Sequence, residues 1–228
     1  MKYILAIYLL LFYQALFADM NAVHALEVFK HDADEAYITG HYQNAFNMYR
    51  KLATIGDKFA QFRLAVMYAE GLSVDADPVL AYAWSHVAAE NDQVQYRQFD
   101  SAIEASLDEK ELVAAHDLAE DLLSRYGVFA NAVAAKKMLD RARRNCTGSR
   151  TGSRCDAVTS ITLTNDCTAN YTSFPSKECL RTGSLGLLSV SGNFPASLNR
   201  LETALDIVIE TYNPGNVELD ELELLNDD

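Results

Sequence analysis

Histidines and serines are the residues from which this chain would build catalytic or metal chemistry. The five histidines are His24, His31, His41, His86 and His116. No two of them stand three or four residues apart, the spacing that puts two metal ligands on one helical face. For His86, we favour packing beside Trp84 over metal ligation. The sequence also lacks a Gly-x-Ser-x-Gly elbow, a phosphate-binding glycine loop and a zinc-protease motif. It therefore predicts no catalytic residue, no cofactor site and no metal site.

The four cysteines, Cys146, Cys155, Cys167 and Cys179, lie in one stretch of the chain, separated by eight, eleven and eleven residues. Structural zinc sites instead use ligand pairs about two to four residues apart. An even number of cysteines in a loop-rich segment is typical of a disulfide framework in an exported protein. We therefore expect disulfides among these cysteines, with free thiols or a metal as the alternatives.

The first residues predict export. Lys2 gives a positive start, Tyr3 to Phe12 carries no charged side chain, and Ala15 to Ala18 ends in a small residue before Asp19. These are the parts of a secretory signal peptide, and the apolar run is shorter than the ~20 residues of a membrane span. We expect cleavage near Ala18 and a periplasmic or secreted protein that meets the membrane only through the signal sequence. An uncleaved membrane anchor is the alternative.

The charge of the chain restricts its partners. It has 19 Lys and Arg residues against 32 Asp and Glu residues, a formal net charge of −13. Affinity for nucleic acid depends on cationic contacts to phosphates, so we expect no nucleic-acid partner. Half of the residues are hydrophobic, which is typical of a globular protein with a core.

Helices must position most of the chain before residue 144, because Ala, Leu and Tyr recur there at helical spacing. Glycines at helix ends adopt the left-handed conformation cheaply, and the predicted ends are Gly40, Gly56, Gly71 and Gly127. Aspartate caps helix starts, and the predicted caps are Asp57, Asp77 and Asp108. The expected helices span 22–38, 42–54, 58–70, 78–91, 93–106 and 108–126.

These helices repeat. Sliding the sequence by 36 residues aligns Ala45-Phe46 with Ala81-Tyr82 and Leu52-Ala53 with Ala88-Ala89. A self-match of this period in a helical region indicates stacked helical hairpins, which must stack because one hairpin cannot bury its apolar face alone. The expected aromatic skeleton, mostly core with a minority lining a concave groove, comprises Phe59, Phe62, Tyr68, Tyr82 and Trp84.

Residues 60–90 resemble the Sel-one-like repeat family, which is related to the tetratricopeptide repeats. The resemblance rests on AQFRLAVMYAEG at 60–71 and on AYAW followed by AA at 81–89. The repeat-signature positions are Leu64, Tyr68, Gly71, Asp77, Ala81, Trp84, Ala88 and Ala89. Two departures are Ala65 and Ser73, which stand where the family usually has glycine. The resemblance implies an α/α superhelix that binds a protein or a peptide, and residues 36–56 fit an earlier, degenerate copy.

The segment from Cys146 to Cys155 contains a Thr-Gly-Ser-Arg turn. It resembles a short segment of other bacterial envelope proteins, and that resemblance favours pairing of Cys146 with Cys155 and of Cys167 with Cys179. This is one of three possible connectivities for four cysteines.

The chain after residue 144 has a different composition, rich in Ser, Thr, Gly and Asn. Residues 161–164 and 187–190 alternate as strands do. For 205–219 we prefer a terminal β-hairpin, because 205–212 is rich in β-branched residues and Asn213-Pro214-Gly215-Asn216 indicates a turn. A helix over 197–210 is the alternative, because Leu198, Leu201, Leu205 and Ile209 also share a helical face.

The predicted fold class is α+β. A signal peptide (1–18) precedes an all-α repeat array of helical hairpins (19–143), and a small, disulfide-stapled, β-rich region (144–228) follows. We expect an exported, non-catalytic repeat protein that mediates protein–protein or peptide interactions in the bacterial envelope, with another envelope protein or a peptide as its partner. The alternative is a cell-wall-associated binding protein or enzyme with its site in the cysteine-rich C-terminal region.

Overall fold

The computed structural model describes residues 26–146, 159–161, 188–190 and 195–214. A first helix over 26–38 is followed by α2 (Tyr42–Thr54), α3 (Lys58–Glu70), α4 (Pro78–Ala89), α5 (Val94–Glu104), α6 (Glu109–Tyr126) and α7 (Val128–Cys146). In the C-terminal part of the chain, the helix α9 spans Pro195–Thr211. No helix in these described ranges is long and apolar enough to cross a membrane.

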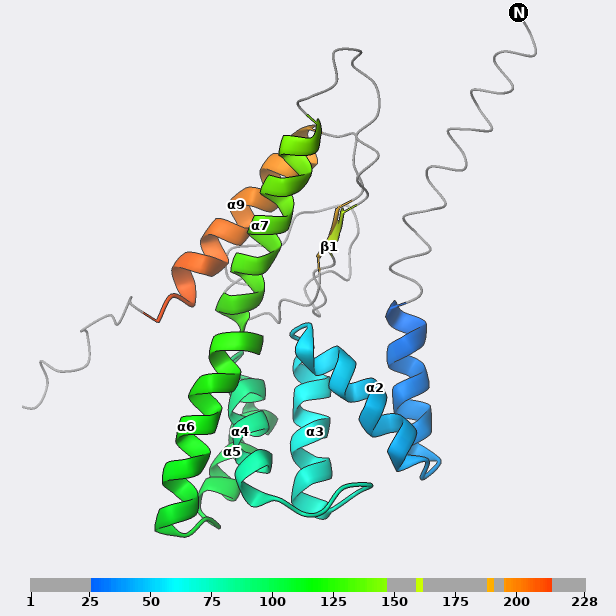
Figure 1. The fold of residues 1–228 in the computed structure, drawn as a ribbon, viewed down its shortest axis with the longest axis vertical. Coiled ribbons are helices and arrows are strands. Elements are labelled where there is room, and N and C mark those ends of the chain that lie inside the picture. Colours follow the sequence, from blue (N-terminus) through cyan, green and yellow to red (C-terminus); the bar gives the residue numbers. More distant parts are fainter. Residues whose placement is uncertain (1–25, 147–158, 162–187, 191–194, 215–228) are drawn as a thin grey trace, which may run out of the picture.

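The predicted helices are confirmed from α2 to α6, with ends that differ by at most two residues. Only 26–38 of the first predicted helix is described. The helix α7 was not among the expected ones. It follows α6 after the single residue Gly127 and continues in nearly the same direction (Figure 1).

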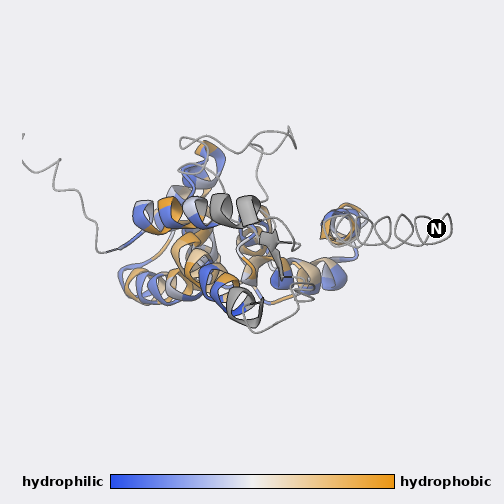
Figure 2. Cartoon of the chain, turned by 90° about the horizontal axis from the view of Figure 1, so that it is seen from above, coloured by the Kyte–Doolittle hydropathy of each residue, from blue (hydrophilic) through white to orange (hydrophobic). Residues whose placement is uncertain are grey.

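The core lies between the stacked helices, with α4 at its centre. This helix packs against α3, α5 and α6, and seven of its residues are buried, from Ala81 to Ala88. Its alanines Ala81, Ala83 and Ala88 are 0% exposed, so the neighbouring helices approach its backbone closely. Figure 2, seen from above, shows the hydrophobic segments gathered between these helices. The described array is therefore a stack of helical hairpins, as the 36-residue repeat predicts.

A second, smaller core joins α7 to α9. Val128, Ala132 and Leu139 of α7 pack with Leu205 and Val208 of α9, and each of the five is at most 1% exposed. The preferred terminal β-hairpin is therefore wrong for 205–211, and the alternative helix is confirmed there. The β-branched residues of 205–212 lower helix propensity only slightly. Burial of Leu205 and Val208 against α7 outweighs their preference for strands.

A short antiparallel ribbon is described within the C-terminal region. β1 (Thr159–Ile161) pairs with β2 (Leu188–Val190), with Thr159 opposite Val190 and Ile161 opposite Leu188. β2 lies inside the predicted strand 187–190, and β1 overlaps the predicted strand 161–164 only at Ile161. The other residues from 147 to 194 lie outside the described part, so the β-rich character of this region stays a prediction.

Candidate interaction surface

The repeat-signature residues build the scaffold of the array. Leu64, Ala81, Trp84 and Ala88 are buried, and the Trp84 ring stacks on Tyr126 of α6 with ring centres 5.7 Å apart. The remaining four signature residues are partly exposed or act at helix ends: Tyr68, Gly71, Asp77 and Ala89. Packing or helix termination explains all eight residues. They therefore stabilise the helical array and are not themselves candidates for binding a partner.

The predicted helix caps are confirmed. Asp57 and Asp77 each accept a hydrogen bond from a backbone N–H three residues later, at 2.9 Å. Asp108 forms a capping box with Glu111. Gly40, Gly56 and Gly71 have positive φ angles, as expected.

Gly127 departs from the prediction, because its φ of −68° and ψ of 170° are extended rather than left-handed. A Cβ at this position would lie 2.5 Å from the Leu123 carbonyl oxygen and 3.2 Å from Glu90 Oε1. Close approach, and not a positive φ, therefore explains the glycine here.

A buried lysine joins three elements of the array. Lys58 is 2% exposed, and its Nζ donates to Glu90 Oε2 at 2.8 Å, to the Val87 carbonyl at 2.6 Å and to Gln61 Oε1 at 3.1 Å. Burial lowers the pKa of Lys58, and Glu90 opposes that shift. Glu90 also accepts from the backbone N–H of Val128 at 2.8 Å. The cluster links α3, α4 and the start of α7.

Exposed and partly exposed aromatic rings lie on the first helices of successive hairpins, which are 26–38, α3 and α5. The guanidinium carbon of Arg63 lies 4.6 Å from the ring centre of Tyr37 and 4.8 Å from that of Phe59. We name these three residues the arginine platform. Phe59 is 37% exposed, and the other two side chains are partly buried. The platform is thus open to solvent on a rigid helical support.

The aromatic surface continues from α3 to α5. The ring of Phe62 stacks on Tyr96 with centres 4.9 Å apart and meets Phe99 edge-on at 5.2 Å. Such pairs contribute about 0.5–1.5 kcal/mol beyond their buried area. Phe62 and the platform therefore form one face across three helices, which we call the first-helix face.

The electrostatics of the platform are unusual for an acidic protein. Among the described residues, no carboxylate forms an ion pair with Arg63, and its Nε is buried without a hydrogen-bond partner. The carboxylate of Asp34 on the first helix accepts a hydrogen bond from the Tyr49 hydroxyl at 2.6 Å. Burial and that carboxylate raise the pKa of Tyr49, so its hydroxyl stays a donor.

Two histidines meet where α4, α5 and α6 join. The rings of His86 and His116 both stack on Tyr82, with centres 5.5 and 5.3 Å away. His86 Nδ1 lies 3.1 Å from Asp100 Oδ2, and Ser85 donates to Asp100 Oδ1 at 2.6 Å. The hydrogen bond to Asp100 raises the pKa of His86, and burial raises that of Tyr82 to about 12. Packing thus explains His86, as predicted. Its ring stacks on Tyr82, not on the nearby Trp84.

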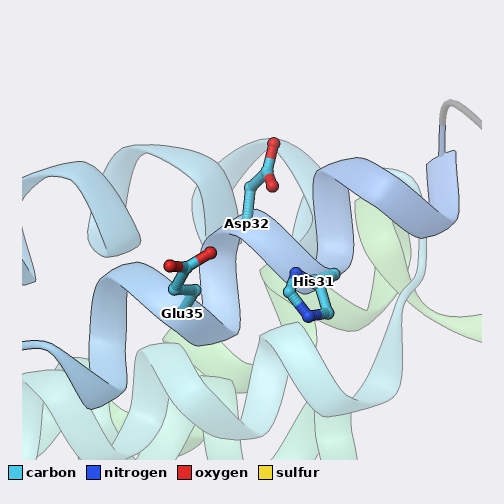
Figure 3. Close-up of side chains that lie close together, drawn as sticks. All are labelled: His31, Asp32 and Glu35. Carbon is cyan, nitrogen blue, oxygen red and sulfur yellow. The ribbon is translucent and has the colours of Figure 1, made fainter.

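His31 lies in the only described group of three side chains that could hold a metal ion. Its ring nitrogen and carboxylate oxygens of Asp32 and Glu35 lie within 4.8 Å of one another on the first helix. All three side chains are exposed (Figure 3), and in the described structure no residue holds their ligand atoms in place by a hydrogen bond. Metal sites normally have such support. The sequence analysis did not predict this group, because it considered only pairs of histidines.

Several predicted features lie outside the described residues. These are the signal peptide (1–18), His24, and the cysteines Cys155, Cys167 and Cys179. Cys146 ends α7, and the disulfides stay a prediction. The alternative C-terminal site also lies mostly outside the described part.

The first-helix face was predicted only in part. Sequence reasoning named Phe59 and Phe62 among aromatics of which a minority line a groove, but it did not name Tyr37 or Arg63. The spacing of Phe59 and Arg63, which stand four residues apart on one helical face, could have identified Arg63. No local signal identifies Tyr37, because it lies on another helix.

A solved structure is similar to part of this chain. It is described as a protective antigen present in uropathogenic Escherichia coli strains that displays an SLR fold. The two chains are 32% identical with a TM-score of 0.38, and the match covers 42% of this chain and 21% of that chain. The chain thus spans about a fifth of the length of that structure. No protein-family model and no curated protein matches the chain. The described helices pack against one another as stacked hairpins, so the chain is a helical repeat protein.

Proposed function

We propose that this chain is an exported, non-catalytic repeat protein that holds another envelope protein or a peptide against its first-helix face. The observation that carries the proposal is the arginine platform, in which the guanidinium of Arg63 lies against the exposed ring of Phe59 and the partly exposed ring of Tyr37 on packed helices. Arginine and aromatic residues dominate the binding energy of many protein interfaces. Helices held by a core present such residues with little loss of conformational entropy on binding.

Burial differs between the first helices. The helices α3 and α4 each bury seven residues, whereas α5 contributes only Tyr96 as a buried residue. Side chains of α5 and the exposed ring of Phe59 are therefore available to a partner. In stacked repeats, such a surface extends across neighbouring units.

Site-specific crosslinking tests the proposed face. A photoreactive benzoylphenylalanine at Phe59 conserves the aromatic ring at the platform, and the same residue at Val113 provides a control, because Val113 is 62% exposed on α6. We expect an envelope protein to be captured from Phe59 and not from Val113. Equal capture from both positions, or capture from Val113 alone, would contradict the proposed face.

Export is tested separately by the mass of the chain recovered from the envelope fraction. Cleavage after Ala18 gives a mature chain that begins at Asp19. Recovery of the uncleaved chain in the membrane fraction would instead support the anchor. Recovery in the cytoplasm would contradict both.

A further inference from the structure

We propose that His86 makes the α5 part of the first-helix face respond to pH, because its protonated ring ties α5 to α4 through Asp100. This inference rests on the proposed function and concerns the regulation of the same face. The α5 part of the face consists of Tyr96 and Phe99, whose ring centres lie 4.9 and 5.2 Å from that of Phe62 on α3.

The helix α5 is held on two sides. Asp100 reaches α4, where its Oδ2 lies 3.1 Å from His86 Nδ1. Phe99, the preceding residue, instead meets Phe62 of α3. Tyr96 stands four residues before Asp100, so the two share one face of the helix. A weaker contact between Asp100 and α4 therefore lets the rings of α5 move away from Phe62.

The proton on the imidazole decides the strength of this contact. When His86 is protonated, both ring nitrogens are donors, and Nδ1 donates to the Asp100 carboxylate in a charge-assisted hydrogen bond. The neutral ring carries one proton, and the tautomer that holds it on Nε2 presents a lone pair to the carboxylate. The Ser85 hydroxyl donates to Asp100 Oδ1 at 2.6 Å in either state, so α5 loosens without detaching.

Charged groups on α4 and α5 favour the protonated ring. The hydrogen bond to Asp100 raises the pKa of His86, burial of the ring lowers it, and the charges of Asp100, Glu104 and Glu90 raise it further. The net shift is upward from the ordinary 6.5. The contact with Asp100 is therefore complete below that unfolded-state value and weakens as pH rises through the higher folded-state pKa.

The neighbouring helices also bring charged groups to this cluster. Lys58 of α3 pairs with Glu90 at 2.8 Å, which partly neutralises that carboxylate. His116 of α6 places its Nε2 3.2 Å from the Tyr82 hydroxyl and 3.6 Å from Glu104 Oε1. It is thus a second imidazole on the same tyrosine, with a different carboxylate beside it, and it provides an internal comparison for His86.

Fluorine NMR on α5 tests the response. 4-Fluorophenylalanine at Phe99 of the full chain reports whether this ring stays packed on Phe62, and relaxation dispersion measures the population of the undocked state. The same residue at Phe46 is the control, because Phe46 is 6% exposed on α2. We expect the undocked population at Phe99 to be about twofold larger at pH 8 than at pH 6, because partly exposed ion pairs contribute little. At Phe46 we expect no change.

Substitution of each histidine locates the sensor. His86→Gln should remove the pH dependence at Phe99, because an amide side chain does not titrate, and Asp100→Asn should remove it from the other side of the contact. His116→Gln is the matched control, since both imidazoles stack on Tyr82, with ring centres 5.5 and 5.3 Å away. It should keep the response. Circular dichroism at both pH values checks that each variant is folded.

The outcomes separate this inference from the proposed function. An undocked population at Phe99 that is equal at both pH values, or that changes equally in the parent chain and in His86→Gln, would overturn the pH response. Loss of the response in His116→Gln alone would overturn its assignment to His86. If Phe59 captures an envelope protein while Phe99 does not respond, the proposed function stands and only its regulation is excluded. A response at Phe99 without capture from Phe59 supports the His86 contact and contradicts the proposed function instead.

Discussion

The hairpin α3–α4 and the helix α5 are held in the array by different means. Each helix of the hairpin buries seven residues, including three alanines of α4 at 0% exposure and the lysine Lys58. The helix α5 buries only Tyr96 and reaches α4 through Asp100, which accepts hydrogen bonds from Ser85 and lies beside His86. The difference teaches that one unit of the repeat is stabilised by close packing, whereas its neighbour combines the contacts of Tyr96 and Phe99 with Phe62 and polar contacts that solvent and pH can reach.

The buried lysine gives the largest expected effect. Lys58→Met should lower the free energy of unfolding by about 3–5 kcal/mol, because it leaves the Glu90 carboxylate without its buried partner. Urea denaturation measures the loss, and Lys110→Ala on the exposed part of α6 is the control. The double variant with Glu90→Gln should recover part of the loss. If Lys58→Met behaves like Lys110→Ala, the hairpin does not depend on this cluster.

Substitutions at Trp84 and Val94 compare the closely packed hairpin with the less buried helix α5. Trp84→Ala should cost about 3–5 kcal/mol, because it opens a cavity where the indole stacks on Tyr126. Val94→Ala on α5 should cost at most about 0.5 kcal/mol, since Val94 is 59% exposed. Thermal unfolding compares the two variants, and similar losses would remove the contrast between the two regions.

Two glycines distinguish steric approach from backbone conformation. Gly127→Ala should cost about 1–3 kcal/mol, because its Cβ would meet Glu90 and the Leu123 carbonyl. Gly40→Ala should cost about 1 kcal/mol, because its φ is +79° but its Cβ would meet nothing within 4 Å. Unfolding in urea ranks the pair. A larger loss of stability for Gly40→Ala than for Gly127→Ala would show that the Glu90 side chain moves at little cost to make room for the added Cβ.

The attachment of α5 should depend weakly on pH. The hydrogen bond to Asp100 raises the pKa of His86 above its ordinary 6.5. The stability that it contributes is therefore complete below that unfolded-state value and is lost as pH rises through the higher folded-state pKa. Because the imidazole is 43% exposed, the change should be about 0.5 kcal/mol or less.

Hydrogen exchange in α5, compared just below pH 6.5 and at pH 8 after correction for intrinsic rates, checks this dependence. We expect weaker protection at pH 8 in the parent chain and no difference in His86→Gln. Asp100→Asn should remove the same dependence. A parent chain whose α5 protection does not change with pH would refute the contribution of this pair.

The helices of the array were predictable because their signals are local. Asp57, Asp77 and Asp108 cap helix starts by bonds to backbone groups two or three residues away, so a short window contains both partners. The repeat signature was predictable for a similar reason, since its alanines and Trp84 recur at a fixed period. The helix α7 was missed because Gly127 was predicted to end the last helix of the array, whereas a further helix begins at the next residue.

The sequence by itself determined the helical repeat, the positions of its caps and the buried alanines of α4, because spacing along one chain encodes each of them. Only the tertiary structure decided that 205–211 is helical, because the burial of Leu205 and Val208 depends on α7, more than 60 residues earlier. It also decided that Arg63 lies between Tyr37 and Phe59, and that Lys58 meets Glu90 at 2.8 Å. These contacts join side chains of different helices, and their geometry follows from how the helices pack rather than from the sequence of any one of them.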